Sequence, residues 1–142
     1  MADSNDWVYT IESKIFTIVK TRLNTALLST YPKLNVTQQQ KLNDEPSFPT
    51  VYIQMLDSPE MGSDLNNTTV NAMLATFEVH IIMSKEQGLG GLRKVQSAVT
   101  DNFKKLRFNM VTRGEFTRET NDTYTSISRF RRVIGGNEEI NL

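Results

Sequence analysis

The chain of 142 residues contains no cysteine and only one histidine. Without cysteine it can have no disulfide bond, no thiolate metal site and no cysteine nucleophile. The single histidine, His80, has no second histidine or cysteine with which to bind a metal or to pair as base and nucleophile, so a structural or surface role is expected for it. We therefore predict no catalytic residue, no metal site and no cofactor, and a protein that is not an enzyme.

Long apolar runs are also lacking. No stretch approaches the ~20 apolar residues that a membrane span needs. The opening residues, MADSNDWVYT, lack the basic region and apolar run of a secretory signal. We expect a protein that is made and kept in a cytosol-like compartment, without a membrane partner. The length fits a single domain, 1–142, with an ordered core at about 6–135 and a loose C-terminal end at 136–142.

Charge of one sign is not in excess, because sixteen basic residues balance sixteen acidic ones. The distribution is uneven: residues 1–64 hold eight acids and five bases, whereas residues 104–132 hold eight bases and three acids. Such polarity could orient contacts between neighbouring copies of the protein, since complementary potentials set register. It could equally be solvated surface.

Two segments have apolar residues at spacings of three and four, which predicts amphipathic helices at about 6–28 and about 89–106. The first ends before Pro32, which biases Tyr31 away from helical angles. The apolar stripes are Val8, Ile11, Ile15, Ile18, Val19, Leu23, Ala26 and Leu27 in the first, and Leu89, Leu92, Val95, Val99, Phe103 and Leu106 in the second.

Alternating β-branched and aromatic residues predict strands at 50–57 and 68–83, and a closing hairpin with strands at about 108–119 and 122–134. A weaker edge strand is expected within LNVTQQQ, and 58–67 is expected to be a polar loop. No βαβ period is present. The fold class is therefore α+β: a mainly antiparallel sheet of about four to five strands covered by two amphipathic helices.

The glycine cluster in SKEQGLGGLRKVQ matches neither phosphate-binding pattern. A Walker loop needs Gly-Lys-Ser/Thr, but Arg93 and Lys94 follow without a hydroxyl, and the third glycine of a dinucleotide loop is replaced by Arg93. The glycines are instead expected to allow a strand-to-helix turn. An anion at the helix start, assisted by Arg93, is the alternative.

The remaining acidic clusters offer little chemistry. Asp44 with Glu45, and Glu138 with Glu139, are adjacent in expected loops, and DSPEMGSD only loosely imitates an oxygen-ligand metal loop. SRFRRV, by contrast, places an aromatic residue between arginines, as nucleic-acid-binding surfaces do. Alternation sends Arg129 and Arg131 to one face and Phe130 and Arg132 to the other, which favours Phe130 as a core residue.

The arrangement of these segments resembles the tail terminator or tail completion proteins of tailed bacteriophages and related contractile particles. The resemblance covers about residues 11–135: a first helix with IESKIFTIVKTRLN, SFPTVYIQMLD, then ATFEVHI, a helix end LRF where the family pattern has LGF, and NDTYTSISRFRRVIG. The matching residues are Phe48, Pro49, Phe77, Glu78, Val79, Ile81, Leu106, Arg107, Phe108, Tyr124, Arg129, Phe130 and Ile134.

The resemblance implies a ring, usually of six copies, that caps the head-proximal end of a tail tube, stops its polymerisation and offers a joining surface to the neck or head connector. The implied partners are further copies of the chain, the tail tube protein and the connector, with transient contact to passing DNA. The implied location is the neck region of a virion assembled in the host cytoplasm. Candidate interface residues are Glu60, Asp64, Arg113, Glu115, Arg118, Glu119, Arg129, Arg131 and Arg132.

Two alternatives remain open. A head–tail connector protein of the neck could share this layout. A nucleic-acid-binding module would use the Arg129–Arg132 cluster, although the balanced charge does not favour it.

Overall fold

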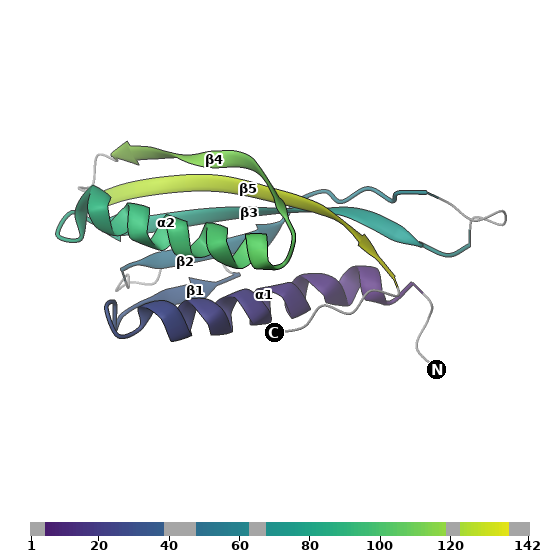
Figure 1. Cartoon of the computed structure of the whole chain (residues 1–142), viewed down its shortest axis with the longest axis horizontal. Helices are drawn as coiled ribbons and strands as arrows, with labels where there is room; N and C mark the ends of the chain where they lie inside the picture. The colour runs from purple at the N-terminus through teal and green to yellow at the C-terminus, as the bar shows by residue number, and fades with distance from the viewer. Residues whose placement is uncertain (1–4, 39–47, 63–67, 119–122, 137–142) are drawn as a thin grey trace.

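The computed structural model describes residues 5–38, 48–62, 68–118 and 123–136. In chain order its elements are α1 (Trp7–Leu27), β1 (Asn35–Thr37), β2 (Thr50–Met55), β3 (Ala72–Ser84), α2 (Gly88–Lys105), β4 (Asn109–Arg118) and β5 (Thr123–Gly135). The strands form one five-stranded sheet in the order β1-β2-β3-β5-β4. Both helices pack on one face, α1 against β1 and β2 and α2 against β3, β4 and β5 (Figure 1). The expected α+β class is confirmed.

Both helices follow the periodicity that predicted them. The buried side chains of α1 are six of its eight predicted stripe residues, because the stripe is the only side of the helix that faces the sheet. Of the other two, Val8 is partly buried and Ala26 is exposed. In α2, Leu92, Val95, Val99 and Phe103 are fully buried, while Leu89 in the first turn is 40% exposed.

The sheet is built around β3. All thirteen residues of β3 pair with β5 in antiparallel register, and six of them also pair with β2. The edge strand predicted within LNVTQQQ exists as the three residues of β1, which run parallel to β2. The β1–β2 pair is the only parallel pair among the described strands.

The start of β3 differs from the predicted residue 68. The side chain of Asn5 accepts a hydrogen bond from the Val70 amide (2.8 Å) and donates one to the Thr68 carbonyl (3.0 Å). These bonds tie 68–70 to the start of α1 rather than to a neighbouring strand. The strand therefore begins at Ala72.

The described part of the predicted polar loop at 58–67 has no regular secondary structure, but its backbone is still bonded to β3. After β2 ends, the chain continues along β3: Leu56 donates to Thr76, Leu74 donates to Pro59, and Met61 donates to Ala72, at 2.8–2.9 Å. Glu60 also forms a bridge with Met73. Residues 63–67 lie outside the described part of the chain, as do the predicted TND turn and the acidic pairs at 44–45 and 138–139.

Four phenylalanines fill the core where α2 crosses the sheet. Phe103 of α2 stacks on Phe130 of β5 with ring centroids 4.7 Å apart, and it meets Phe108 edge-on at 5.3 Å. Phe77 of β3 contacts both Phe103 and Phe108, at 5.8 and 5.7 Å. All four side chains are fully buried. Offset and edge-on aromatic pairs add to the apolar burial, so this cluster fixes α2 on the sheet.

The only tryptophan in the sequence joins three elements. The indole Nε1 of Trp7, at the start of α1, donates to the Val70 carbonyl just before β3 (3.1 Å). A side chain at Gly136, after the end of β5, would come within 2.9 Å of the same indole. Gly136 itself donates to the Asn71 carbonyl at 2.9 Å. The indole therefore closes one end of the molecule.

At the end of α2 the chain has LRF where the tail-terminator pattern has LGF, and the arginine of LRF, Arg107, has an unusual backbone conformation. Arg107 has φ of 68°, and the Phe108 amide reaches back to the Phe103 carbonyl at 3.0 Å. This is the helix-terminating turn in which glycine is preferred, because a side chain strains the left-handed conformation. The LRF sequence thus puts an arginine where LGF would put an unstrained residue.

We predict that Arg107→Gly raises the free energy of unfolding by about 0.5–1 kcal/mol, since relief of the left-handed strain exceeds the added flexibility of the unfolded chain. Urea unfolding monitored by circular dichroism measures the change. Lys104→Gly, three residues earlier within the helix, is the matched control and should lower stability by about 1 kcal/mol. A destabilised Arg107→Gly variant contradicts the strain.

Candidate functional site

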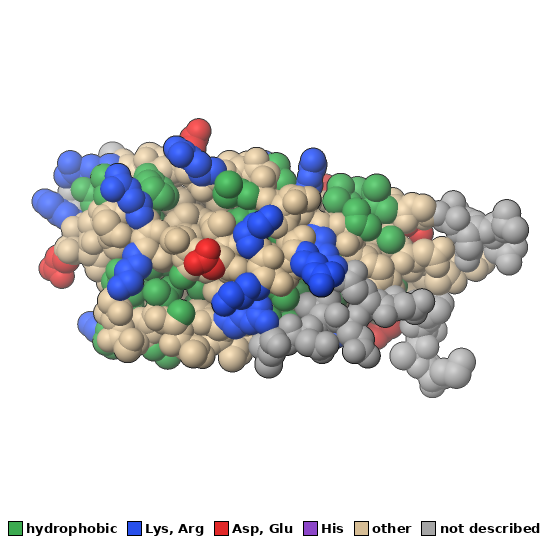
Figure 2. All heavy atoms as spheres, in the orientation of Figure 1, with side chains coloured by type: hydrophobic (Ala, Val, Ile, Leu, Met, Phe, Trp, Pro, Cys, Tyr) green, Lys and Arg blue, Asp and Glu red, His purple; other side chains and the backbone are tan. Residues whose placement is uncertain are grey.

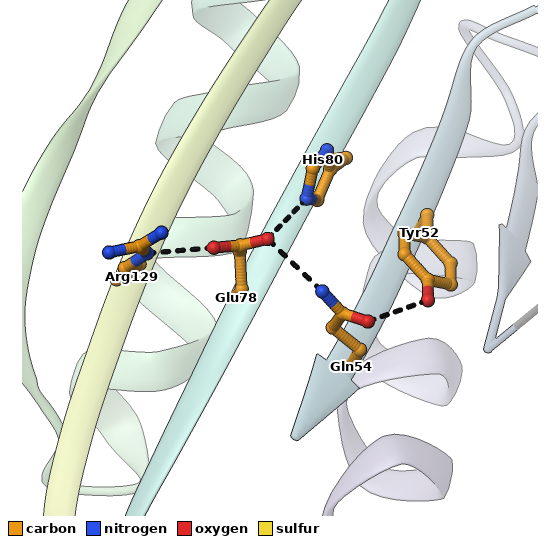
Figure 3. Close-up of polar contacts among 5 residues, drawn as sticks. All are labelled: Tyr52, Gln54, Glu78, His80 and Arg129. Carbon is orange, nitrogen blue, oxygen red and sulfur yellow. Dashed lines mark hydrogen bonds and ion pairs between the residues drawn. The ribbon is translucent and has the colours of Figure 1, made fainter. Parts of the chain in front are cut away.

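The face of the sheet opposite the helices carries a cluster of polar side chains from three strands (Figure 3). Register places Gln54 of β2, Glu78 of β3 and Arg129 of β5 in one row across the sheet. Tyr52 and His80 lie in the next row, beside Ile127. Neither helix covers this face, so we call it the open face.

Glu78 is the centre of the cluster. Its Oε2 accepts a hydrogen bond from Nε of Arg129 (2.7 Å), and its Oε1 accepts one from Nε2 of Gln54 (3.1 Å) and contacts Nε2 of His80 (2.5 Å). The Tyr52 hydroxyl donates to Gln54 Oε1 at 2.8 Å. These neighbours leave the Glu78 side chain only 9% exposed, although it lies on the uncovered face.

Two opposing effects act on the pKa of Glu78. Burial raises the pKa of the carboxyl group, whereas the hydrogen bonds from His80, Arg129 and Gln54, with the charge of His80, lower it, and together they outweigh burial. The pKa of Glu78 is therefore lower than its ordinary value, and the carboxylate is the form that the cluster stabilises.

The arrangement links three neighbouring strands, because Glu78 of β3 binds both Gln54 of β2 and Arg129 of β5. A carboxylate bound to an imidazole can orient a general base. Here the Tyr52 hydroxyl is bonded to Gln54, and the Tyr52 ring packs beside His80 with centroids 5.5 Å apart. Among the described residues, no three or more acidic or histidine side chains are grouped so as to hold a metal.

The structure does not bring the candidate interface residues into a single patch. Arg113, Glu115 and Arg118 lie on β4, at one edge of the sheet, and Glu60 lies beside the start of β3 on the β2 side. Arg129 and Arg131 occupy the open face, as alternation predicted. Asp64 and Glu119 lie outside the described residues.

Arg132 points to the helix side of the sheet, also as alternation predicted. Its Nη1 donates to the Leu106 carbonyl at 2.9 Å, at the end of α2. Burial, and secondarily the nearby charge of Arg107, lower the pKa of Arg132. Because Arg132 is engaged there and Arg129 is engaged by Glu78, the three arginines of SRFRRV do not form one basic surface. Phe130 is fully buried in the core.

The basic side chains on the helix-bearing face of the sheet are also dispersed (Figure 2). Figure 2 shows Lys and Arg in separate groups over the left and middle of the helix-bearing face rather than gathered in one track. A protein that holds a nucleic-acid backbone would concentrate them along a stripe.

The glycine cluster forms the first turn of α2. Gly88 has φ of 68°, which confirms the expected strand-to-helix turn. Gly91 serves close packing instead, because a Cβ there would come within 2.9 Å of Met83 and 3.2 Å of the Tyr31 hydroxyl. An anion bound at the start of α2 with the help of Arg93 stays a prediction.

The segments that carry the family resemblance meet in three dimensions. Phe77 faces Phe130 and Glu78 faces Arg129 across β3 and β5, and Phe108 joins the same aromatic cluster.

The FP segment before β2 is also held by other parts of the chain. The peptide bond between Phe48 and Pro49 is cis. The Phe48 carbonyl accepts a hydrogen bond from the Gln87 side chain (3.2 Å), and the Pro49 carbonyl accepts one from the Asn35 amide (2.9 Å). The pattern is thus a set of mutual packing partners.

No protein-family model matches the chain, and no curated protein matches its sequence. Neither of the two described helices is long and apolar enough to cross a membrane.

Sequence reasoning missed the polar cluster in which Glu78 binds both Arg129 and Gln54, and Gln54 in turn binds Tyr52. Their alternation within predicted strands put them on one face, but only the register of β2, β3 and β5 shows that they touch. It also missed an acidic groove lined by Tyr9, Glu12, Asp57 and Glu60, since these residues come from segments that no local pattern connects.

We predict that Glu78→Gln lowers the free energy of unfolding at pH 7 by about 1–3 kcal/mol, because hydrogen bonds to a buried charged group are lost. Since the folded pKa of Glu78 is below the unfolded value of 4.5, its stabilisation is complete above pH 4.5 and is lost as pH falls through the folded pKa. The gap between wild type and variant should therefore shrink in acid.

Urea unfolding at a series of pH values from 7 down to 3 measures this gap. Glu86→Gln, at an exposed position in the turn before α2, is the matched control and should leave stability nearly unchanged. A gap that stays constant with pH contradicts the role of the Glu78 carboxylate.

Proposed function

We propose that the chain is a structural virion protein, a tail terminator or tail completion protein whose copies close into a ring on the head-proximal end of a tail tube. The observation that supports the proposal most is the convergence of the family-like segments: FEV of β3, RF of β5 and the LRF helix end form one packed unit. A resemblance confined to unrelated surface segments would carry less weight.

The mechanism is geometric. A tube grows by repeating unlike contacts along its axis, and a ring that matches the tube on one face but lacks the next contact on the other ends growth. A single sheet with helices on one side and an open polar face on the other offers two chemically different sides for this purpose. The free side of the ring then serves as the joining surface for the neck or head connector.

A neck connector or stopper protein is the second candidate, because it would use the same ring and the same two faces. It differs in its partner: it binds the head connector and leaves tube growth unaffected. The nucleic-acid-binding alternative has no supporting observation, since Arg129 and Arg132 are engaged on opposite sides of the sheet. Contact with passing DNA would be limited to phosphates, without sequence reading.

We expect that the purified protein, added while the tube protein of the same particle polymerises, shortens the tubes and is found at one end of each by electron microscopy. Multi-angle light scattering should give a ring of six 16.2 kDa chains, free or after release from tubes. Protein added after polymerisation is the control; it should bind one end without changing tube length.

Unchanged tube lengths together with binding to the head connector would favour the stopper. A monomer that shifts DNA in moderate salt would favour the nucleic-acid-binding module, and either result would refute the terminator.

A further inference from the structure

The two edges of the sheet are unlike each other, and each exposes apolar side chains. One edge is β4, which pairs only with β5 among the described strands. On the other side, β1 covers only Thr50–Tyr52 of β2, and the described strands leave the segment from Ile53 to Met61 without a partner on its outer side. Such edges can accept another chain unless something blocks them.

The edge beyond β2 borders a groove that we call the acidic groove. Tyr9 and Glu12 of α1 form one wall, and Leu56, Asp57 and Glu60 form the other. Every charged residue that lines the groove is a carboxylate. Glu12 accepts a hydrogen bond from the Met55 amide at 3.3 Å, which occupies the place of a strand neighbour at the end of β2.

Tyr9 stands out within the acidic groove because it is 83% exposed, more than any other large hydrophobic residue described. Met61, at the end of the same edge, is 42% exposed. Exposed aromatic residues beside a groove are typical anchors of protein interfaces.

The β4 edge has complementary chemistry. Arg113 and Arg118 flank the single acid Glu115 on a ten-residue strand whose side chains are almost all exposed. Met110, Val111 and Phe116 of this strand are 46%, 47% and 39% exposed. The strand therefore presents Met110 and Val111 before Arg113, and Phe116 between the two arginines.

The shape of β4 is also suited to a limited contact. Its pairing with β5 has irregularities between Met110 and Thr112 and between Thr112 and Glu115. Gly114, with φ of 99°, sits in the second, where a Cβ would come within 2.7 Å of Ser126 Oγ. Bulges of this kind bend an edge strand and restrict continuous pairing, so side chains rather than a long ladder would make the contact.

We propose that the β4 edge of one copy docks in the acidic groove of the next copy, with Arg113 facing the carboxylates and Phe116 packing near Tyr9. This proposal deepens, and rests on, the ring function proposed above. The contact joins two different surfaces, so repeating it produces a closed ring or an open filament rather than a two-fold dimer.

Charge complementarity favours the β4 edge of a second copy over two other possible occupants of the acidic groove. A symmetric contact of two acidic grooves would oppose carboxylates to carboxylates, which is repulsive. The chain's own last six residues carry Glu138 and Glu139 and no base, so they also match the sign of the groove. A second copy offering Arg113 has the opposite sign.

Cross-linking tests the pairing directly, because the chain has no cysteine of its own. We expect Glu60→Cys/Phe116→Cys, treated with a short bismaleimide, to give a ladder of products up to the closed ring. Each single variant alone should stay monomeric on denaturing gels. A mixture of the two single variants should give a dimer and nothing larger.

Two results would overturn the proposal. Efficient dimers from Phe116→Cys alone would show a symmetric β4 contact. Absence of the mixed cross-link, both in the free protein and in protein bound to tube ends, would place the contact between copies elsewhere. If tubes are capped without this cross-link, the ring function stands and the interface fails; if the cross-link forms but tubes grow on, the reverse holds.

Charge reversal gives an independent measure. Arg113→Glu should weaken self-association about tenfold, and adding Glu60→Arg should recover most of that loss. Lys33→Glu makes the same charge change at an exposed position before β1 and should have little effect. Equal weakening by Arg113→Glu and Lys33→Glu, or no recovery in the double variant, would overturn the pairing.

Discussion

The ladder between β3 and β5 is the constraint on which the rest of the molecule depends. Its thirteen paired residues place Phe77 against Phe130 on the helix side and Glu78 against Arg129 on the open face. The first pair forms the platform on which Phe103 stacks, and so positions α2. A shift of one residue in this register would turn one of the two strands over and put either Glu78 of β3 or Arg129 of β5 on the side of the aromatic core.

The sequence was most informative where one side of an element is buried. The helical stripes and the alternation in Ser128–Val133 predicted which residues face the core, because burial imposes a period on the chain. It was least informative where side chains override the local pattern. Asn5 delays the start of β3 by bonding to 68–70, and backbone bonds from Leu56 to Met61 extend the path of β2 through an expected loop. Neither effect leaves a periodic signal.

The same distinction applies to the candidate site. Alternation correctly separated Arg129 and Arg131 from Arg132, but the polar cluster around Glu78 and the acidic groove each depend on three or more segments meeting. Contacts between such distant segments depend on the strand register and on how α1 lies across β2. A single sequence specifies neither of these. The proposed ring function rests on the family resemblance, and the proposed contact between the unlike edges depends on it.

The position of Trp7 has an optical consequence. Because it is the only tryptophan in the chain, all of the indole fluorescence of this protein comes from the point where the start of α1, the approach to β3 and the end of β5 converge. Tyr9 of the acidic groove lies two residues away on the same helical turn. The emission wavelength therefore monitors hydration of this one corner, and it does so without any added dye.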